Sequence, residues 1–485
     1  MAFYKSIISQ ITLYKYRYFV GYSAVVALLL TVLLVDINSI PNGISEPEMA
    51  SAVTSMHLDP NLSLAWIVNA PHHLLQQLSI NLLGLSRASL VAPSLFFGIL
   101  TIILFNMTIR RWFSRSISII STIITSTTAS FMILARGGTP DIMLAFWTVL
   151  FIFAGVSFLV NHERGFRWKI LIVLAGVGLL YTPYGIYTLL ACLLGGLVHP
   201  HVRSRLKRVK PVRLATLIGL GLISLIPLVI YALQQPSSLV LLTGLDQLPQ
   251  SIDQLRTHLA TIVGLYLDFT NSRVVDTFLT PVFNIASLAL MLFGLFRLIQ
   301  KHHTARSYVM LTWLATTGLV LILISQSPHI ALMPAMFLLA FGIKALIEEW
   351  YTLFPRNPYA RFAGLLPLGV LLVGISTSNL MHYFNSFRYM STPAYSASLS
   401  AVKQSVKLEG NRAVTVVTSE ATKPFYEILK TNYPQLTVTS TLPPQITQPT
   451  LVLPNIASSY PDKSPSRVFV TWNQENNVVL RVYRP

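Results

Sequence analysis

The chain has 485 residues, of which 53% are hydrophobic and only 11% are charged. A soluble globular protein carries roughly 25% charged residues, so this composition excludes an ordinary soluble enzyme, and its hydrophobic content excludes a disordered chain. The formal net charge of +18 is interpreted as loop charge that orients a membrane protein, with no nucleic acid as partner.

Apolar segments close to the ~20 residues that cross a bilayer recur along the first 380 residues. They predict a polytopic α-helical membrane protein with about eleven transmembrane helices. The fifth and sixth segments meet at a Pro and Gly break, and we favour two spans over one kinked span because the loop charges then sort correctly. The predicted spans are 17–36, 88–109, 116–135, 141–160, 168–182, 185–198, 214–233, 277–299, 307–325, 329–347 and 363–380.

Lys and Arg residues concentrate in the loops on one side of these spans, most densely at 203–213. The positive-inside rule makes this side cytoplasmic, so we expect a multi-pass protein of the plasma membrane with its N-terminus inside and its C-terminus outside. The predicted organisation is a transmembrane domain at 1–380, with external loops at 37–87 and 234–276, and a soluble external domain at 381–485.

The C-terminal segment is predicted to be a small α/β domain, because helical patterns there are followed by short apolar strands. We expect it to cover or shape the external cavity of the membrane domain. Helices are predicted at 395–409 and 423–431, and strands at 413–417, 436–439, 451–453, 468–471 and 478–482.

Acidic residues outside this domain gather on the external side, where chemistry at that face would need them. Glu46 and Glu48 lie where a turn leads from a membrane helix into a short helix, so their carboxylates are expected at the membrane surface. Asp141 opens the fourth span, where the helix dipole favours a carboxylate, and Arg136 is placed to pair with it or to bind an anion. Each acid also has a plain interpretation as a solvating loop charge.

Four segments follow one another in an order that matters for the function. The sequence SEPEMA at 45–50 is similar to an Asp-Glu-x-Arg-Tyr-Ala motif, and NAPHHLL at 69–75 to Lys-Pro-Pro-Leu-Tyr. The sequence TPDIML at 139–144 is similar to Leu-Asp-Pro-Met-Leu, and the helix break at 178–185 to Leu-Thr-Lys-Gly-Pro. Together they resemble the polytopic GT-C glycosyltransferases that use polyprenyl-phosphate sugars, which include protein mannosyltransferases and the aminoarabinose transferases of lipid A.

The resemblance implies an enzyme that moves a sugar from a polyprenyl-phosphate donor to a hydroxyl of an envelope glycan, lipid or protein, with inversion at the anomeric carbon. Glu46 then stands at the position best placed to take the acceptor proton, and Glu48 is the second candidate. Ser45 occupies the position of the family's Asp, and Glu48 that of its Arg. Cations such as Arg136, or Arg256 with Arg273, would offset charge on the departing phosphate.

The substrate-binding residues implied by the same segments combine these cations with polar groups. They are Asp141, Arg136, His72, His73, Asn69, Arg256, Arg273 and Tyr181. The donor sugar-lipid is the substrate. A divalent cation stays open as a cofactor, since Glu46, Glu48, His72 and His73 include metal-binding residue types, but their spacing predicts no metal site.

Two other function classes stay open from the sequence. A lipid or glycan transporter would suit many spans with broken helices, but charged residues near the centres of the spans are scarce and no inverted repeat is visible. A non-catalytic scaffold that displays the C-terminal domain is favoured by Ser45 and by Ala70, which replace an acid and a cation of the family's motifs.

Overall fold

The fold is given by a computed structural model. It describes residues 17–57, 64–160, 165–207, 209–270, 272–275, 278–324, 328–354, 358–390, 395–454, 464–470 and 478–485.

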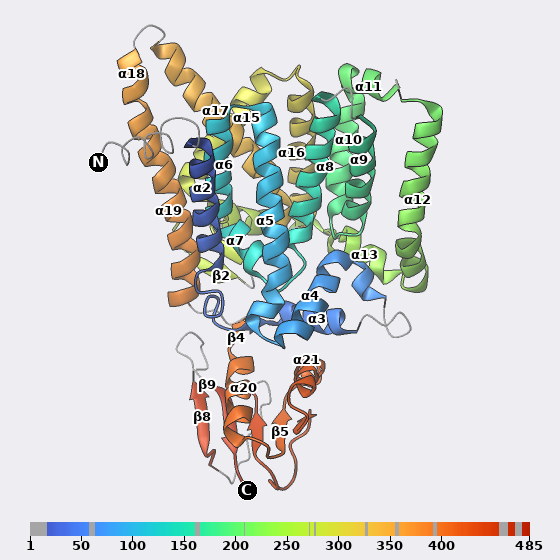
Figure 1. The fold of residues 1–485 in the computed structure, drawn as a ribbon, viewed down its shortest axis with the longest axis vertical. Helices are drawn as coiled ribbons and strands as arrows, with labels where there is room; N and C mark the ends of the chain where they lie inside the picture. The colour runs from blue at the N-terminus through green and yellow to red at the C-terminus, as the bar shows by residue number, and fades with distance from the viewer. Residues whose placement is uncertain are drawn as a thin grey trace, which may run out of the picture.

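Long helices packed side by side form the upper body of the molecule (Figure 1). A helix lies at each of the eleven predicted spans, although the number that cross the membrane stays a prediction. Within the described ranges, five helices are long and apolar enough to span it, or six if the bent pair α6 and α7 is one span. The helices of this bundle are α2 (Arg17–Leu34), α5 (Arg87–Trp112), α6 (Arg115–Thr127), α7 (Ala129–Arg136), α8 (Ile142–Val160), α9 (Gly165–Leu180), α10 (Gly185–Val198), α12 (Pro211–Gln234), α15 (Ile285–Gln300), α16 (Ala305–Leu323), α17 (Leu332–Leu353) and α19 (Leu365–Tyr389).

The third predicted span is not straight, because α6 and α7 meet at an angle of 66°. No proline lies at the bend. Instead, the hydroxyl of Thr127 donates to the carbonyl of Ile123 at 2.9 Å, and that of Thr128 donates to Ile124 at 2.8 Å. Hydroxyls that bond back to the preceding turn compete with the helical ladder and bend helices. The bend turns α7 toward the face that carries the candidate site.

Small residues let the bundle pack closely at its centre. A Cβ added to Gly294 on α15 would meet the backbone of Leu338 and Gly342 on α17, and one added to Gly342 would meet the carbonyl of Leu290. The two backbones therefore touch, as membrane helices do where glycines face one another.

The lower end of the bundle is closed by helices that lie across it (Figure 1). They come from the segment between α2 and α5, the first one predicted to be external, and comprise α3 (Glu46–Met56), the turn η1 (Ala65–Ile67) and α4 (Ala70–Leu83). Because α4 packs on both α3 and α5, this platform is fixed to the bundle.

The segment at 234–284 holds more structure than a loop. The predicted span 277–299 begins only at Ile285, because residues 278–280 pair with 273–275 in an antiparallel hairpin that packs against α7 and α19. The elements here are α13 (Ser237–Thr243), η2 (Leu245–Gln247), α14 (Ile252–Leu267), β2 (Arg273–Val275) and β3 (Phe278–Thr280). The remaining short helices are α11 (Pro200–Lys207), η3 (Pro328–Ala331) and α18 (Pro358–Ala363).

The C-terminal residues form a five-stranded sheet in the order β6-β5-β7-β9-β8, with β5 parallel to β6 and β7. Its strands coincide within one residue with the predicted ones wherever the structure describes them. Only Thr471, the end of one predicted strand, lies outside the described residues. The elements are α20 (Ser398–Glu409), β5 (Val414–Val417), α21 (Lys423–Glu427), η4 (Ile428–Thr431), β6 (Leu436–Thr439), β7 (Thr450–Val452), β8 (Arg467–Val470) and β9 (Val478–Tyr483).

This sheet domain shares a hydrophobic core with the platform. Met49 and Ala52 of α3 belong to the same buried cluster as Val402 of α20 and Phe425 of α21. A short strand pair, β1 (Ile44–Ser45) with β4 (Tyr395–Ser396), adds backbone hydrogen bonds between the two parts. The start of α3 is therefore built jointly by the segment that follows α2 and by the C-terminal chain.

Gly43 is where this junction is tightest. Its φ is +123°, and a Cβ there would collide with the backbone of Ser396. We expect Gly43→Ala to lower the free energy of unfolding by roughly 1–3 kcal/mol and to speed protease cleavage between the platform and the sheet domain. Gly410→Ala is the matched control, because Gly410 also has a positive φ of +61° but has open space around it. Equal cleavage rates in both variants would contradict the proposed close contact.

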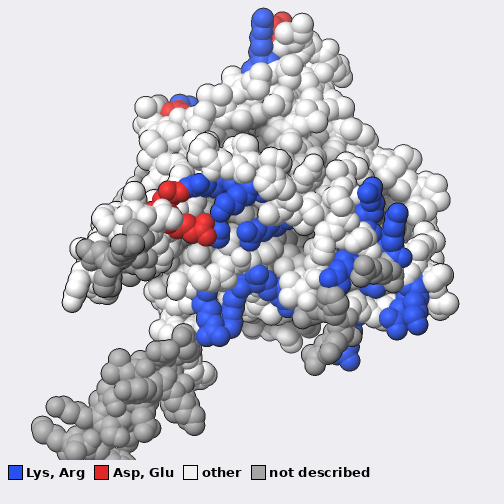
Figure 2. Space-filling view, turned by 90° about the horizontal axis from the view of Figure 1, so that it is seen from above, with Lys and Arg blue, Asp and Glu red and all other residues white. Residues whose placement is uncertain are grey.

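Basic side chains gather at the opposite end of the bundle, as Figure 2 shows from above. Arg110 and Arg111 end α5, and Arg205 and Lys207 end α11. Acidic partners at this end come from α17, where Glu348 accepts from Lys344 at 2.7 Å. This is the end that the positive-inside rule predicts to face the cytoplasm.

Candidate functional site

Glu48 is buried at the junction of three segments. The residue is 2% exposed. One carboxylate oxygen accepts from the backbone N–H of Ser45 at 2.8 Å, and the other accepts from Gly138 at 2.7 Å. The first bond is the reciprocal half of a capping box, in which an acid at the third helical position closes the helix start. Arg87 lies 3.6 Å from the same carboxylate. Glu48 therefore ties α3 to the 137–141 loop between α7 and α8.

Gln76 of α4 holds the same loop from the other side. Its amide N–H groups donate to the carbonyls of Gly138 at 2.8 Å and Leu90 at 3.0 Å. Its carbonyl oxygen accepts from Ser51 at 2.9 Å and Ser55 at 2.6 Å. Each polar group of Gln76 is thus satisfied inside the protein, as buried amides require.

His72 and His73 belong to this buried network. Ser55 Oγ lies 2.8 Å from His73 Nδ1, so these two side chains form a hydrogen bond. His72 Nε2 lies 2.9 Å from Ser94 Oγ, which donates to the carbonyl of Thr139 at 3.0 Å. Burial lowers the pKa of His73 to about 4 and the pKa of His72 well below its ordinary value. Both imidazoles are neutral near pH 7, so neither supplies a cation for a phosphate.

The lowered pKa of His73 makes the platform sensitive to acid. The unfolded chain binds this proton near pH 6.5 and the folded chain only near pH 4, so between these values the unfolded state holds more protons. Stability is therefore complete above pH 6.5 and falls as the pH drops toward 4, by about 3 kcal/mol over the whole window. We expect His73→Asn to reduce this loss when thermal stability is compared at pH 7.5 and pH 5. An identical drop in both proteins would assign the acid sensitivity to other groups.

Arg136 lies inside the protein, only 1% exposed. Its guanidinium donates to the carbonyls of Val32 at 3.2 Å, Val35 at 2.8 Å and Ile40 at 3.2 Å, around the C-terminal end of α2. Arginine commonly stabilises helix C-termini in this way. Among the described residues no ion pair joins Arg136 to Asp141. The two terminal nitrogens of Arg136 donate to these carbonyls, while its buried Nε has no hydrogen-bond partner among the described residues.

Arg87 is the buried neighbour of Arg136. It donates to the carbonyls of Ile37 at 3.1 Å, Gly43, and Arg136 at 3.4 Å. Two buried guanidiniums therefore share this region with the buried carboxylate of Glu48.

Two of the predicted acids are accessible. Glu46 begins α3 and is exposed, and no hydrogen bond or ion pair to it is found among the described residues. Asp141 is exposed at the end of the 137–141 loop and accepts from the hydroxyl of Thr139 at 2.6 Å. Because Glu48 and Gly138 hold the start of α3 against this loop, both acids belong to adjoining segments. His329 of η3 interacts electrostatically with Asp141 and stacks on Phe278, with 4.5 Å between ring centroids.

The remaining predicted residues are spread over two other places. Arg256 on α14 pairs with Asp253 at 3.3 Å, and Arg273 on β2 lies 3.7 Å from Asp268, both on the surface. Asn69, buried and left-handed with φ 57°, donates its backbone N–H to the carbonyl of Tyr181 at 2.9 Å. The Tyr181 hydroxyl donates to Ser224 at 2.7 Å on α12. Asn69 and Tyr181 thus join the platform to the break between α9 and α10.

Sequence reasoning missed several residues of the network. Ser51 and Ser55 are four residues apart on α3, and Gln76 follows His72 by four on α4, so each set shares one helical face. That spacing of polar residues was a usable signal for a buried polar interface. Within the described ranges, no group of three or more His, Cys, Asp or Glu side chains is placed to hold a metal ion.

Comparison with known proteins finds similarity in sequence to one family and similarity in fold to solved structures. Residues 71–231 match the dolichyl-phosphate-mannose-protein mannosyltransferase family, and no curated protein sequence matches the chain. The structure of ArnT from Cupriavidus metallidurans bound to undecaprenyl phosphate is similar, with a TM-score of 0.56 and 13% identity over 95% of this chain and 98% of that one. Its apo state gives 0.55 and 14%, over 96% and 98%.

The oligosaccharyltransferase AglB from Archaeoglobus fulgidus, in complex with an inhibitory peptide and a dolichol-phosphate, gives a TM-score of 0.47 and 12% identity over 86% of this chain and 64% of that one. At these identities the likeness to ArnT shows a shared fold. The resemblance to GT-C glycosyltransferases predicted from the four motifs is thereby confirmed.

Proposed function

We propose that the chain is an integral membrane glycosyltransferase that moves a sugar from a polyprenyl-phosphate donor to an acceptor hydroxyl. The observation that carries the proposal is the ArnT-like fold over 95% of the chain combined with an exposed carboxylate, Glu46, at the start of α3. The undecaprenyl phosphate bound to ArnT supports a lipid phosphate as the donor class. The platform face is taken as extracytoplasmic in the plasma membrane, with the basic end of Figure 2 inside.

Glu46 is the residue we assign as general base. It accepts the proton of the acceptor hydroxyl while the acceptor oxygen attacks the anomeric carbon from the face opposite the phosphate. The bond between the anomeric carbon and the phosphate oxygen breaks, polyprenyl phosphate leaves, and the configuration inverts. Asp141, on the adjoining segment, is assigned to bind sugar hydroxyls.

Cations must offset the charge on the departing phosphate. Arg136 is committed to backbone carbonyls, and His72 and His73 are neutral. Arg256 and Arg273 belong to the segment predicted to be external. Among the described residues, Arg256 pairs with the exposed Asp253 and Arg273 with the partly exposed Asp268, so their charges are available at modest cost. The β2–β3 hairpin that carries Arg273 packs on α7, directly before the 137–141 loop, which favours Arg273 as the phosphate-binding residue.

The test is transfer of radiolabelled sugar by full-length protein in proteoliposomes. A panel of polyprenyl-phosphate sugars is offered, and label is counted in lipid, glycan and protein acceptor fractions. We expect one donor to label one acceptor fraction above protein-free liposomes. Background signal from every donor would instead support the scaffold alternative, which the buried Ser45 in place of the family's Asp favours.

A further inference from the structure

A cavity of about 480 Å³ lies at the basic end of the bundle, where Arg111 and Arg306 are among its lining residues. Its walls come from α5, α8, α9 and α10 and from the start of α16, and they include Arg111, Val160, Ile172, Leu197 and Thr304. Protein interiors leave few voids larger than a water molecule, whereas ligand pockets measure roughly 300–1,000 Å³. The cavity is within the size range of such ligand pockets.

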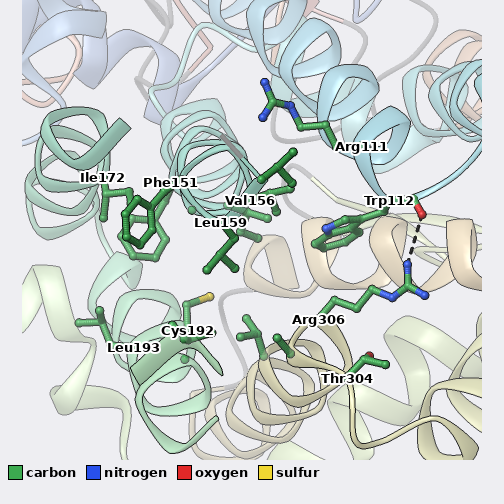
Figure 3. Close-up of a pocket in the computed structure, with 18 of the residues that line it drawn as sticks. Arg111, Trp112, Phe151, Val156, Leu159, Ile172, Cys192, Leu193, Thr304 and Arg306 are labelled. Atoms are coloured by element: carbon green, nitrogen blue, oxygen red, sulfur yellow. Dashed lines mark hydrogen bonds between the residues drawn. The ribbon is translucent and has the colours of Figure 1, made fainter. Parts of the chain in front are cut away.

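The walls of the cavity are almost entirely apolar. Phe151 and Leu159 of α8 and Leu193 of α10 line it, and Trp112 of α5 faces them (Figure 3). Cys192 contributes a buried thiol. Burying a hydrocarbon chain against these walls is favourable, whereas apolar side chains offer no stabilising contact to a free inorganic ion.

Two arginines stand among these apolar residues. Arg111 Nη1 is buried and has no hydrogen-bond partner among the described residues, while the guanidinium carbon lies 4.8 Å from the ring centroid of Phe153. Arg306 Nη1 donates to the carbonyl of Trp112 at 3.2 Å, as the dashed line in Figure 3 marks. In the part of the chain that is described, neither arginine forms an ion pair with a carboxylate. The guanidiniums also contact rings outside the cavity, Arg111 that of Trp168 and Arg306 that of Phe113, and Glu348 interacts electrostatically with Arg306. The cavity is therefore apolar, with two arginines at its edge.

We propose that this cavity binds one acyl chain of an anionic phospholipid from the leaflet at the basic end, with its phosphate beside Arg306 and Arg111. An anionic head group supplies the contacting counter-charge for the two arginines, and an acyl chain fills the apolar space. Basic pockets between membrane helices recognise lipid head groups in this way. The inference is independent of the proposed transferase activity, because the cavity lies at the other end of the bundle.

Gly155 offers a direct test. It lines the cavity, and a Cβ added to it meets no atom within 4 Å, so Gly155→Leu fills the space without a backbone clash. Gly318→Leu is the matched control, because Gly318 of α16 also has open space around it but does not line the cavity. Full-length protein is incubated with phosphatidylglycerol, phosphatidylcholine or inorganic phosphate, and bound molecules are counted by native mass spectrometry.

We expect bound phosphatidylglycerol to fall at least ten-fold in Gly155→Leu and to stay unchanged in Gly318→Leu. Arg306→Gln and Arg111→Gln should each weaken its binding about five-fold, the change that corresponds to one basic group near the membrane surface. If Gly155→Leu does not fold, the two arginine variants test the proposed lipid binding without it. Equal retention of phosphatidylcholine, displacement by inorganic phosphate, or the same loss in both leucine variants would overturn the proposal.

Discussion

Glu46→Gln is expected to lower sugar transfer by 10²- to 10⁴-fold while leaving the thermal stability of the protein unchanged. The amide keeps the size of the side chain but cannot accept the acceptor proton, and a positioned general base contributes about this factor. Stability should not change, because Glu46 is exposed and no contact of its side chain is found among the described residues. Initial rates at saturating donor and a melting curve in detergent measure the two effects.

The matched control for this variant is Asp253→Asn. Asp253 is also an exposed external acid near a helix start, and its partner Arg256 is on the same helix. It should retain transfer within about two-fold, because a surface ion pair contributes little. Loss of activity in both variants would indicate a general need for negative surface charge, and full activity in Glu46→Gln would remove Glu46 from the mechanism.

Hydropathy located the helices of the bundle because a segment that crosses lipid must be long and apolar and must satisfy its backbone hydrogen bonds within itself. The strands of the C-terminal sheet were located for a similar reason, since buried strands are short apolar segments between turn residues. Two local features of these segments were missed, because hydropathy registers neither short strand pairing nor side-chain hydrogen bonds to the helix backbone. The late start of α15 follows from the pairing of 273–275 with 278–280, and the bend at Thr128 follows from hydroxyl bonds within the helix.

The candidate site was also predicted only in part from the sequence. The motif at 45–50 indicated that acids matter at the start of α3, but it could not tell an exposed Glu46 from a buried Glu48. That distinction depends on the N–H of Gly138, which is 90 residues away. Arg136 was likewise predicted to be an external cation. The residues next to it in the sequence do not show that the C-terminal end of α2 lies beside its side chain. Chain-distant backbone groups decide which charged residues are structural.

Glu48→Gln is expected to destabilise the fold more than any other single substitution at the candidate site, by about 3–5 kcal/mol. Its carboxylate is the buried counter-charge for Arg87, whose side chain is 7% exposed. Arg87 also donates to the backbone carbonyl of Arg136, a second buried arginine. Removing one partner of a buried pair leaves the other charge uncompensated, and this cost exceeds the net contribution of the intact pair. The melting temperature in detergent should fall by several degrees, where Glu46→Gln leaves it unchanged.

The role of the pair is separated from general damage by a double-mutant cycle with Arg87→Met. If Glu48 stabilises the fold through Arg87, the two changes should be less than additive, with an interaction energy of about 0.5–3 kcal/mol. Met fills the volume of the arginine stem without its charge, so the double variant no longer buries an unpaired cation. A Glu48→Gln protein that melts like the wild type but does not transfer sugar would give Glu48 the catalytic role in place of Glu46. A structural role predicts the reverse, in which residual transfer follows the fraction of protein that stays folded.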